Sequence, residues 1–149
     1  MSNFISVIEN FLDNEGLHYT TQNRDWGTDT RISFRGEAGS PIRVHIVDRE
    51  DQAPYIIVWD LVHIPKDKLA AALIQTNDDN QRRYFKLAYD EDGDLNFGYE
   101  FPDGLTEESF AAVLEAMFPL YIAGCHLYFE KYNRLIWGNQ SSVDEIKFA

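Results

Sequence analysis

Apolar residues recur along the chain with two different periods, which predict helices and strands in turn. Near the start they follow the three- and four-residue spacing of an amphipathic helix, at Phe4, Ile5, Val7, Ile8, Phe11 and Leu12. Ser2 is the expected N-cap of this helix and Gly16 its expected end. Because the stripe covers only about three turns, we expect the helix to depend on a sheet beneath it.

Two later runs alternate apolar with polar residues, as half-buried strands do. The alternation covers residues 31–35 and 42–46, and residues 36–41 between them are typical of a hairpin loop. Residues 55–59 are apolar at every position, which predicts a central strand covered on both faces. Residues 17–21 before these strands form only a weakly extended stretch.

The second half of the chain continues with a helix and a second hairpin. Pro65 opens the helix, where its missing N–H is tolerated, and the polar residues 77–80 end it. Two alternating runs, 84–89 and 95–101, flank the acidic turn 90–94. They predict two further strands joined by this turn.

A long apolar helix closes the pattern. Thr106 is its expected cap, and Glu107 and Glu108 lie in its first turn, where the positive end of the helix dipole favours carboxylates. Pro119 lies well inside the helical pattern and is expected to kink or divide the helix. Gly138 is its expected end.

The predicted order is helix, three strands, helix, two strands, helix, or α-βββ-α-ββ-α. Hairpin-linked strands separated by helices indicate an α+β fold with a mainly antiparallel, five-stranded sheet. No composition shift or repeat divides the 149 residues. We therefore assign residues 1–138 to a single domain and residues 139–149 to a C-terminal tail.

Charge argues against several classes of partner. The chain carries 25 acidic and 13 basic residues, a formal net charge of -12, which repels nucleic-acid phosphates and anionic lipids. The basic stretch 81–86 is too short to reverse this, and we interpret it as a solvated corner between a helix and a strand. No nucleic-acid partner is expected.

Residues 110–129 are the most apolar stretch, but Glu115, Pro119, Gly124 and His126 interrupt them, so no membrane span is predicted. The first residues lack the basic and apolar regions of a secretory signal. The single cysteine, Cys125, has no second cysteine to form a bridge with. These features predict a cytoplasmic protein.

The residues that could do chemistry do not form a known catalytic or metal-binding pattern. Residues 90–94 resemble a calcium loop, but its sixth and twelfth positions are Leu95 and Phe101 where Gly and Glu are required. The histidines, His18, His45, His63 and His126, lack zinc-site spacing. We predict no metal, no cofactor and no enzymatic activity, and interpret Cys125 as a buried cysteine of an apolar helix.

The element order, together with residues 92–102 (Asp-Gly-Asp-Leu-Asn-Phe-Gly-Tyr-Glu-Phe-Pro) running into Leu105-Thr106-Glu107-Glu108, resembles the YbjN family. Its members are described as bacterial sensory transduction regulators. Their fold is similar to that of the acidic chaperones of type III secretion systems, which are homodimers that bind extended segments of client proteins. The resemblance covers most of residues 4–137 and implies this fold, but it assigns no functional residue.

Together these features favour a non-enzymatic protein-binding module, chaperone-like or regulatory, which forms a homodimer and presents an apolar, acid-rimmed groove to a client polypeptide. Exposed aromatic side chains would anchor such an interface, and the candidates are Trp26, Tyr84, Tyr128, Tyr132 and Trp137. One alternative is a small-ligand sensor or uncharacterised enzyme with a pocket beside the sheet, using His45, Asp60 and His63. Another is a structural subunit of a larger assembly.

Overall fold

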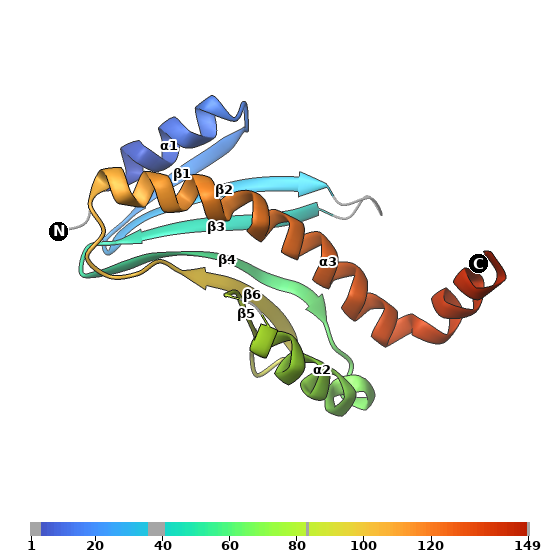
Figure 1. Cartoon of the computed structure of the whole chain (residues 1–149). Helices are drawn as coiled ribbons and strands as arrows, with labels where there is room; N and C mark the ends of the chain where they lie inside the picture. Colours follow the sequence, from blue (N-terminus) through green and yellow to red (C-terminus); the bar gives the residue numbers. More distant parts are fainter. Residues whose placement is uncertain (1–3, 36–40, 83, 149) are drawn as a thin grey trace.

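The computed structural model describes residues 4–35, 41–82 and 84–148 and has two layers, a sheet and a set of helices (Figure 1). In chain order the elements are α1 (Ile5–Asn14), β1 (Tyr19–Arg24), β2 (Gly27–Arg35), β3 (Pro41–Arg49), β4 (Gln52–His63), the 3₁₀ turn η1 (Lys66–Lys68), α2 (Leu69–Arg82), β5 (Lys86–Tyr89), β6 (Asp94–Glu100) and α3 (Glu107–Phe148).

The six strands form one sheet in the order β1-β2-β3-β4-β6-β5, and every pair is antiparallel. The predicted α+β class and antiparallel sheet are confirmed, but the sheet has six strands and not five. The additional strand is β1, which is polar because it lies at the edge of the sheet and shares only one side with a neighbour. A weak apolar pattern is expected for such an edge strand.

The turn between β1 and β2 consists of Asp25 and Trp26, and Gly27 follows it with φ of 148°. A Cβ atom at Gly27 would lie 1.9 Å from the carbonyl oxygen of Asp48 on β3. Glycine is therefore required for β2 to begin this close to β3.

Helix α1 is fixed to the sheet at its start and along one side. The backbone N–H of Phe4 donates a 2.8 Å hydrogen bond to the carboxylate of Asp48, a buried residue. Ile8 and Leu12, one turn apart, are completely buried. The predicted end at Gly16 is confirmed by its φ of 69°, whereas the expected cap Ser2 lies outside the described residues.

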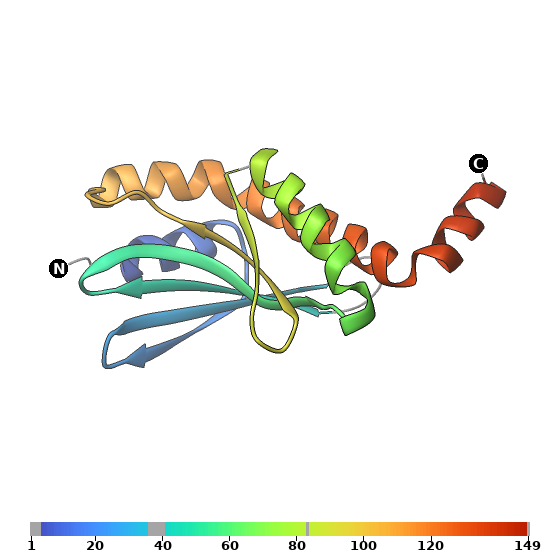
Figure 2. The ribbon, with the colours of Figure 1, turned by 90° about the horizontal axis from the view of Figure 1, so that it is seen from below.

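All three helices lie on the same side of the sheet (Figure 2). On β4, Ile56 and Val58 are buried beneath them, while Tyr55 and Ile57 are only half-buried and Trp59 is exposed. The prediction that residues 55–59 are covered on both faces is therefore wrong. The chain returns from β4 through η1 and α2 to the side already occupied by α1 and α3, so the second face receives no helix.

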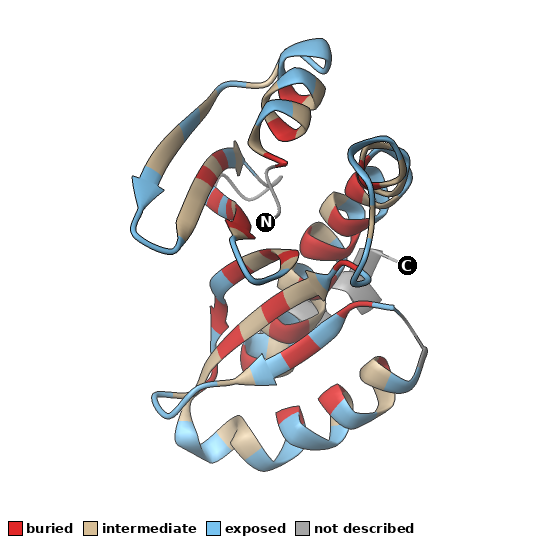
Figure 3. Cartoon of the chain, turned by 90° about the vertical axis from the view of Figure 1, so that its left-hand side faces the viewer, coloured by how far each residue is buried: buried red, intermediate tan, exposed pale blue. Residues whose placement is uncertain are grey.

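The core forms where α3 crosses β6 and the buried sides of helices and strands meet (Figure 3). The ring of Phe97 stacks on that of Tyr121, with centroids 4.8 Å apart and planes 12° apart. Gly124, one turn further along α3, lets the helix approach, because a Cβ atom there would lie 2.8 Å from Phe97. The closeness of α3 to the sheet therefore depends on a glycine inside a helix.

Helix α3 runs without a break through both positions that were expected to interrupt it. Pro119 does not divide the helix, since it is exposed and the carbonyl group it leaves without a partner can be hydrated. Gly138 does not end it either, because one interior glycine costs only about 1 kcal/mol. The backbone of residues 139–148, predicted as a loose tail, is helical and turns away from the sheet (Figure 1). The assignment of residues 1–138 to one domain stays a prediction.

By length and composition, the part Glu107–Gly138 of α3 would be sufficient to cross a membrane. In this fold its inner side is part of the core, with Phe110, Leu114 and Tyr121 completely buried. A core helix of this kind passes the same test. The prediction of no membrane span is neither confirmed nor contradicted by this result.

A hydrogen-bonded cluster joins α2 to α3 and β5. The hydroxyl of Tyr132 donates a 2.8 Å bond to the buried carboxylate of Asp79 and lies 3.0 Å from the hydroxyl of Thr76. Lys131 forms a 2.6 Å ion pair with the same carboxylate. Burial raises the pKa of Tyr132, so its hydroxyl keeps the proton that it donates.

We predict that Tyr132→Phe lowers the free energy of unfolding by about 1–3 kcal/mol, because a buried carboxylate loses one of its donors. The matched control is Tyr84→Phe, the same change at a side chain that is 84% exposed. It should alter stability by less than about 0.5 kcal/mol. Urea unfolding followed by circular dichroism measures both, and equal stabilities of the two variants would contradict the prediction.

Candidate functional site

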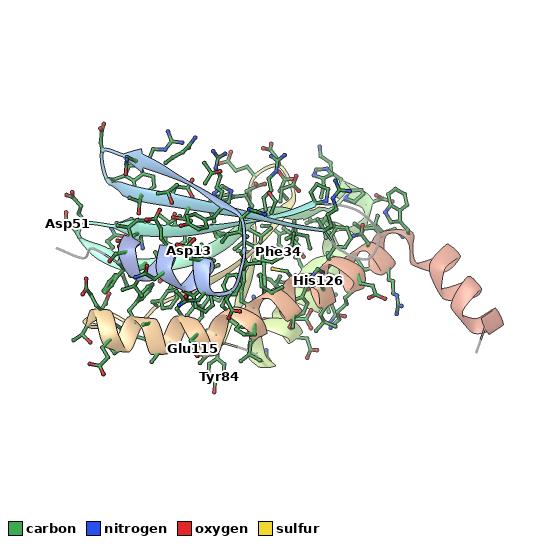
Figure 4. All side chains as sticks on the ribbon, turned by 90° about the horizontal axis from the view of Figure 1, so that it is seen from above. Asp13, Phe34, Asp51, Tyr84, Glu115 and His126 are labelled. Carbon is green, nitrogen blue, oxygen red and sulfur yellow. The ribbon has the colours of Figure 1, made fainter. Side chains whose placement is uncertain are left out.

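The sheet has one face that no helix of the described chain covers, which we call the open face. Successive residues of a strand point to opposite sides, so the strand residues that alternate with the buried core residues form this face. Seen from above, side chains extend from the strands on the side away from the helices (Figure 4). The open face is therefore a continuous surface built on the strands.

The strand register arranges the open face in rows that cross the sheet. The central row crosses all six strands, at Thr20, Arg31, His45, Ile57, Gly98 and Lys86. The next row contains Gln22, Asp29, Val47, Tyr55 and Glu100. Residues in one row are neighbours across the strands and can act on one ligand together.

A groove of about 480 Å³ lies along β4, β5 and β6. Side chains from the open face line most of it, among them Tyr55, Ile57 and Trp59 of β4, Lys86 of β5 and Glu100 of β6. The indole of Trp59 is 52% exposed. An exposed aromatic side chain beside an apolar floor is typical of a recognition surface.

The open face is basic, although the chain as a whole is strongly acidic. Six of the 13 basic residues occupy it: Arg24, Arg31, Arg35, Arg43, Arg49 and Lys86. Among the 25 acidic residues, the same alternation places Asp29, Asp94 and Glu100 on this face. The expected acid-rimmed groove is therefore wrong for this face, because strand alternation sends the arginines of β2 and β3 to the side opposite the core.

Several of these polar side chains are held in place. Arg49 donates a 2.8 Å bond to the carbonyl oxygen of Ala53, and its guanidinium group lies 4.5 Å from the ring centroid of Tyr55. His45 Nδ1 lies 3.0 Å from the carboxylate of Asp29. The Nε atom of Arg31 is buried and has no hydrogen-bond partner among the described residues. The contacts of Arg49 and His45 fix these two side chains on the open face.

Of the residues expected to form a small-ligand pocket, His63 and Asp60 lie close enough to influence each other, but His45 lies apart from them. His45 lies opposite Ile57, whereas His63 lies opposite Asp94, six residues further along β4. This separation is roughly 20 Å along a strand. The expected grouping of His45 with His63 near Asp60 is therefore wrong.

An acidic cluster occupies the end of the sheet beyond the irregularity in β4. Carboxylate oxygens of Asp90, Asp92 and Asp94 lie within 4.8 Å of one another. These three could supply oxygens to a cation, but calcium takes six to eight ligands. The backbone N–H groups of Asp92 and Asp94 donate to Asp90, which accounts for this carboxylate as part of the hairpin turn.

Two groups beside this turn have shifted pKa values. Burial, followed by the negative charge of Asp94, raises the pKa of Asp60. The hydrogen bond to Asp94, 2.7 Å long, raises the pKa of His63. Asp60 also has a left-handed backbone, with φ of 56°, and its N–H donates to the side chain of Asn96. These interactions fix the end of the open face.

Cys125 is buried, as the sequence predicted. Burial raises the pKa of its thiol to about 12. A thiol with this pKa carries almost no thiolate at neutral pH, which is the form that acts as a nucleophile or metal ligand. Cys125 therefore serves as a core residue.

The predicted interface aromatics differ in position. Tyr128 and Tyr132 are buried, because they lie on the side of α3 that faces the sheet and α2, so they are core residues and not surface anchors. Trp26, Tyr84 and Trp137 are exposed, but they belong to the β1–β2 turn, the segment before β5 and the end of α3. Figure 4 shows Tyr84 on the helix side of the sheet, and Tyr84 is one of the residues that line the groove. Contact with a partner stays a prediction for these three.

Trp59, Tyr55 and the basic rows were missed by the sequence analysis. The sequence pattern that indicates the basic rows is the alternation of Arg31, Ser33 and Arg35 with apolar residues. It was overlooked because residues 55–59 appeared to be covered on both faces, which left no surface for these side chains.

A second hollow, of about 780 Å³, lies between the β3–β4 turn and the start of α3. Four acidic residues line it, Glu50, Asp51, Asp103 and Glu107, and Phe4 is its one aromatic residue. It adjoins the first described residue of the chain. The groove on the open face offers more varied chemistry and is the better candidate.

The sequence matches no protein-family model, and no curated protein matches it. Among solved structures, the type III secretion chaperone SycH of Yersinia pestis, in complex with a stable fragment of YscM2, is similar with a TM-score of 0.49 and 13% identity. The match covers 81% of this chain and 98% of that chain. Membership of the YbjN family stays a prediction.

We predict that Asp94→Asn moves the pKa of His63 down toward its ordinary value of 6.5, since the acceptor of its hydrogen bond loses its charge. The wild-type pair stabilises the fold fully below pH 6.5, and this contribution is lost as the pH rises through the raised pKa. An NMR titration of the imidazole signal measures the change. Asp92→Asn is the control and should leave the pKa of His63 in place; an equal shift in both variants would refute the assignment to Asp94.

Proposed function

We propose that this protein is a non-enzymatic binding module that holds a segment of another polypeptide on the open face of its sheet. The observation that carries the proposal is the uncovered face itself, with its groove and the half-exposed Trp59. The solvent-facing side of a sheet is usually polar. The open face instead carries Tyr55, Ile57 and Trp59 in a single line along β4. Aromatic side chains arranged in this way supply anchors for a protein partner.

The β5 edge of the sheet is closed to an added strand. At the β5 edge, the side chain of Asn80 accepts from the N–H of Leu87 and donates to its carbonyl oxygen, with lengths of 2.8 and 2.9 Å. This amide occupies the position that an added strand would take. The groove beside β5 is therefore open to a ligand from the face and closed to strand addition at that edge.

A small-molecule ligand is the second candidate, because a volume of about 480 Å³ is within the range of small-ligand pockets. The residues first expected to serve such a ligand, His45, Asp60 and His63, do not meet in the groove. A polypeptide also accounts for the rows of polar side chains that continue past the groove onto β2 and β3.

The proposed homodimer has a separate surface on α3. Leu120 and Leu127 lie two turns apart on the solvent side of this helix, with Ala116 and Ala123 exposed between and beside them. Apolar residues at this spacing form one stripe along a helix. The stripe lies on the opposite layer from the open face, so a dimer through α3 leaves both grooves accessible.

To test polypeptide binding, the wild-type chain and two variants are screened on an array of random peptides. Trp59→Ala should lose most of the signal, about tenfold or more, because an interface tryptophan is worth at least 1.4 kcal/mol. Ile74→Ala removes an exposed apolar side chain of α2, which does not line the groove, and should retain binding. An array without any bound peptide would refute the proposal, and so would equal binding by both variants.

To test the homodimer, the mass of the chain is measured by light scattering after size-exclusion chromatography. The wild type should be a dimer, and Leu120→Glu with Leu127→Glu should be a monomer because charge is introduced into the apolar stripe. Leu73→Glu with Ile74→Glu makes the same change at exposed positions of α2 and should stay dimeric. A wild-type monomer, or identical masses for both double variants, would refute the α3 dimer.

A further inference from the structure

The open face differs in charge from the rest of the molecule. By strand alternation it carries six basic side chains against Asp29, Asp94 and Glu100, a local excess of positive charge on a chain with a net charge of -12. Of the other acidic residues that the structure describes, Asp48 is buried in β3 and Asp60 lies on β4, and the rest lie on helices, turns and loops. Segregation of this kind is expected where a charged partner binds.

We infer that the segment held on the open face is acidic, an inference that rests on the proposed polypeptide-binding function. The central row carries a cation toward each side, Arg31 on β2 and Lys86 on β5, with Ile57 and Gly98 between them. Four strand spacings separate these cations, which is about 19 Å. An extended segment that crosses the strands spans this distance with acidic residues roughly six positions apart.

The middle of the central row would contact the part of the bound segment that lies between its two acidic residues. Gly98 carries no side chain, so a ligand backbone can approach the sheet there. Ile57 is half-buried and Trp59 lies on the same side of β4. An apolar or aromatic residue between the acidic ones would therefore contact an apolar floor.

Basic side chains of the open face can donate hydrogen bonds to the carboxylate oxygens of a ligand. Arg31 is partly exposed and belongs to the central row of the open face. Arg43 and Lys86 are exposed, so their charged groups are accessible. Arginine also binds a carboxylate through two parallel hydrogen bonds, which adds specificity to the charge.

The same cations could attract nucleic acid, but the surroundings disfavour it. Acidic turns flank the open face at both ends, with Glu50 and Asp51 at one and Asp90, Asp92 and Asp94 at the other. A nucleic-acid strand carries a phosphate charge about every 3.4 Å and would extend past the basic rows onto these turns. A peptide can place a few carboxylates on the basic rows only.

The test uses three fluorescently labelled peptides of otherwise identical sequence, with one aromatic residue between two glutamates, two glutamines or two lysines. Fluorescence anisotropy with the wild-type chain should show the glutamate peptide binding at least about tenfold more tightly than the glutamine peptide. High salt should reduce this difference. A labelled single-stranded oligonucleotide serves as the nucleic-acid probe.

Two double variants with equal net charge locate the effect. Arg43→Glu with Lys86→Glu changes exposed positions of the open face and should abolish the preference for glutamate. Lys66→Glu with Lys68→Glu makes the same charge change at η1 and should retain it. Both pairs lie on the surface, and circular dichroism verifies that each variant is folded.

The outcomes separate this inference from the function on which it rests. Binding of none of the peptides refutes polypeptide binding itself, and with it the inference. Equal binding of the three peptides, or loss of the preference in both double variants, overturns the acidic partner alone. Tighter binding of the oligonucleotide overturns it in favour of nucleic acid, and salt-sensitive self-association that blocks the glutamate peptide overturns it in favour of a second copy of the chain.

Discussion

The fold depends on the packing of α3 against β6. Phe97 stacks on Tyr121, and Gly124 allows the helix to approach the ring of Phe97 directly. With α3 at this distance, α1 and α2 pack on either side of it, as the Phe4–Phe110 stack and the Tyr132–Asp79 hydrogen bond show. All three helices are thereby committed to one face of the sheet, and the opposite face is left to the solvent or to a partner.

This one-sided cover determines the chemistry of the open face. Because side chains alternate along each strand, every apolar residue directed to the core places its neighbours on the outside. In β2 and β3 these neighbours include four arginines, and in β4 they include Tyr55, Ile57 and Trp59. The antiparallel register then brings the two groups together in rows, so that the basic and apolar parts of the surface adjoin.

Local patterns predicted much of the fold. The spacing of apolar residues identified α1, the alternation identified β2 and β3, and Gly16 marked a helix end. β1 was missed because an edge strand shows little apolar alternation. The division at Pro119 and the end at Gly138 were wrong because an exposed proline and one interior glycine do not by themselves stop a long helix. The double-sided cover of β4 was wrong because an apolar run does not reveal on which side the following helix returns.

The candidate site was harder to predict than the fold. Tyr128 and Tyr132 resemble interface aromatics in the sequence, yet their place on the inner side of α3 makes them core residues. Trp59 and Arg31 are far apart in the sequence, and only the register from β2 through β3 to β4 places them on the same surface. The net charge of -12 also concealed a basic surface, since a sum over the chain contains no information on position.

The central claim is that the open face holds the partner, and chemical-shift mapping tests it most directly. Backbone amide spectra of the labelled chain are recorded during titration with the glutamate peptide. We predict that the largest changes occur at Arg31, Ile57 and Gly98 in the central row, with the outer side of α3 unchanged. Changes confined to α3, or a spectrum that does not respond to the peptide, would contradict the account.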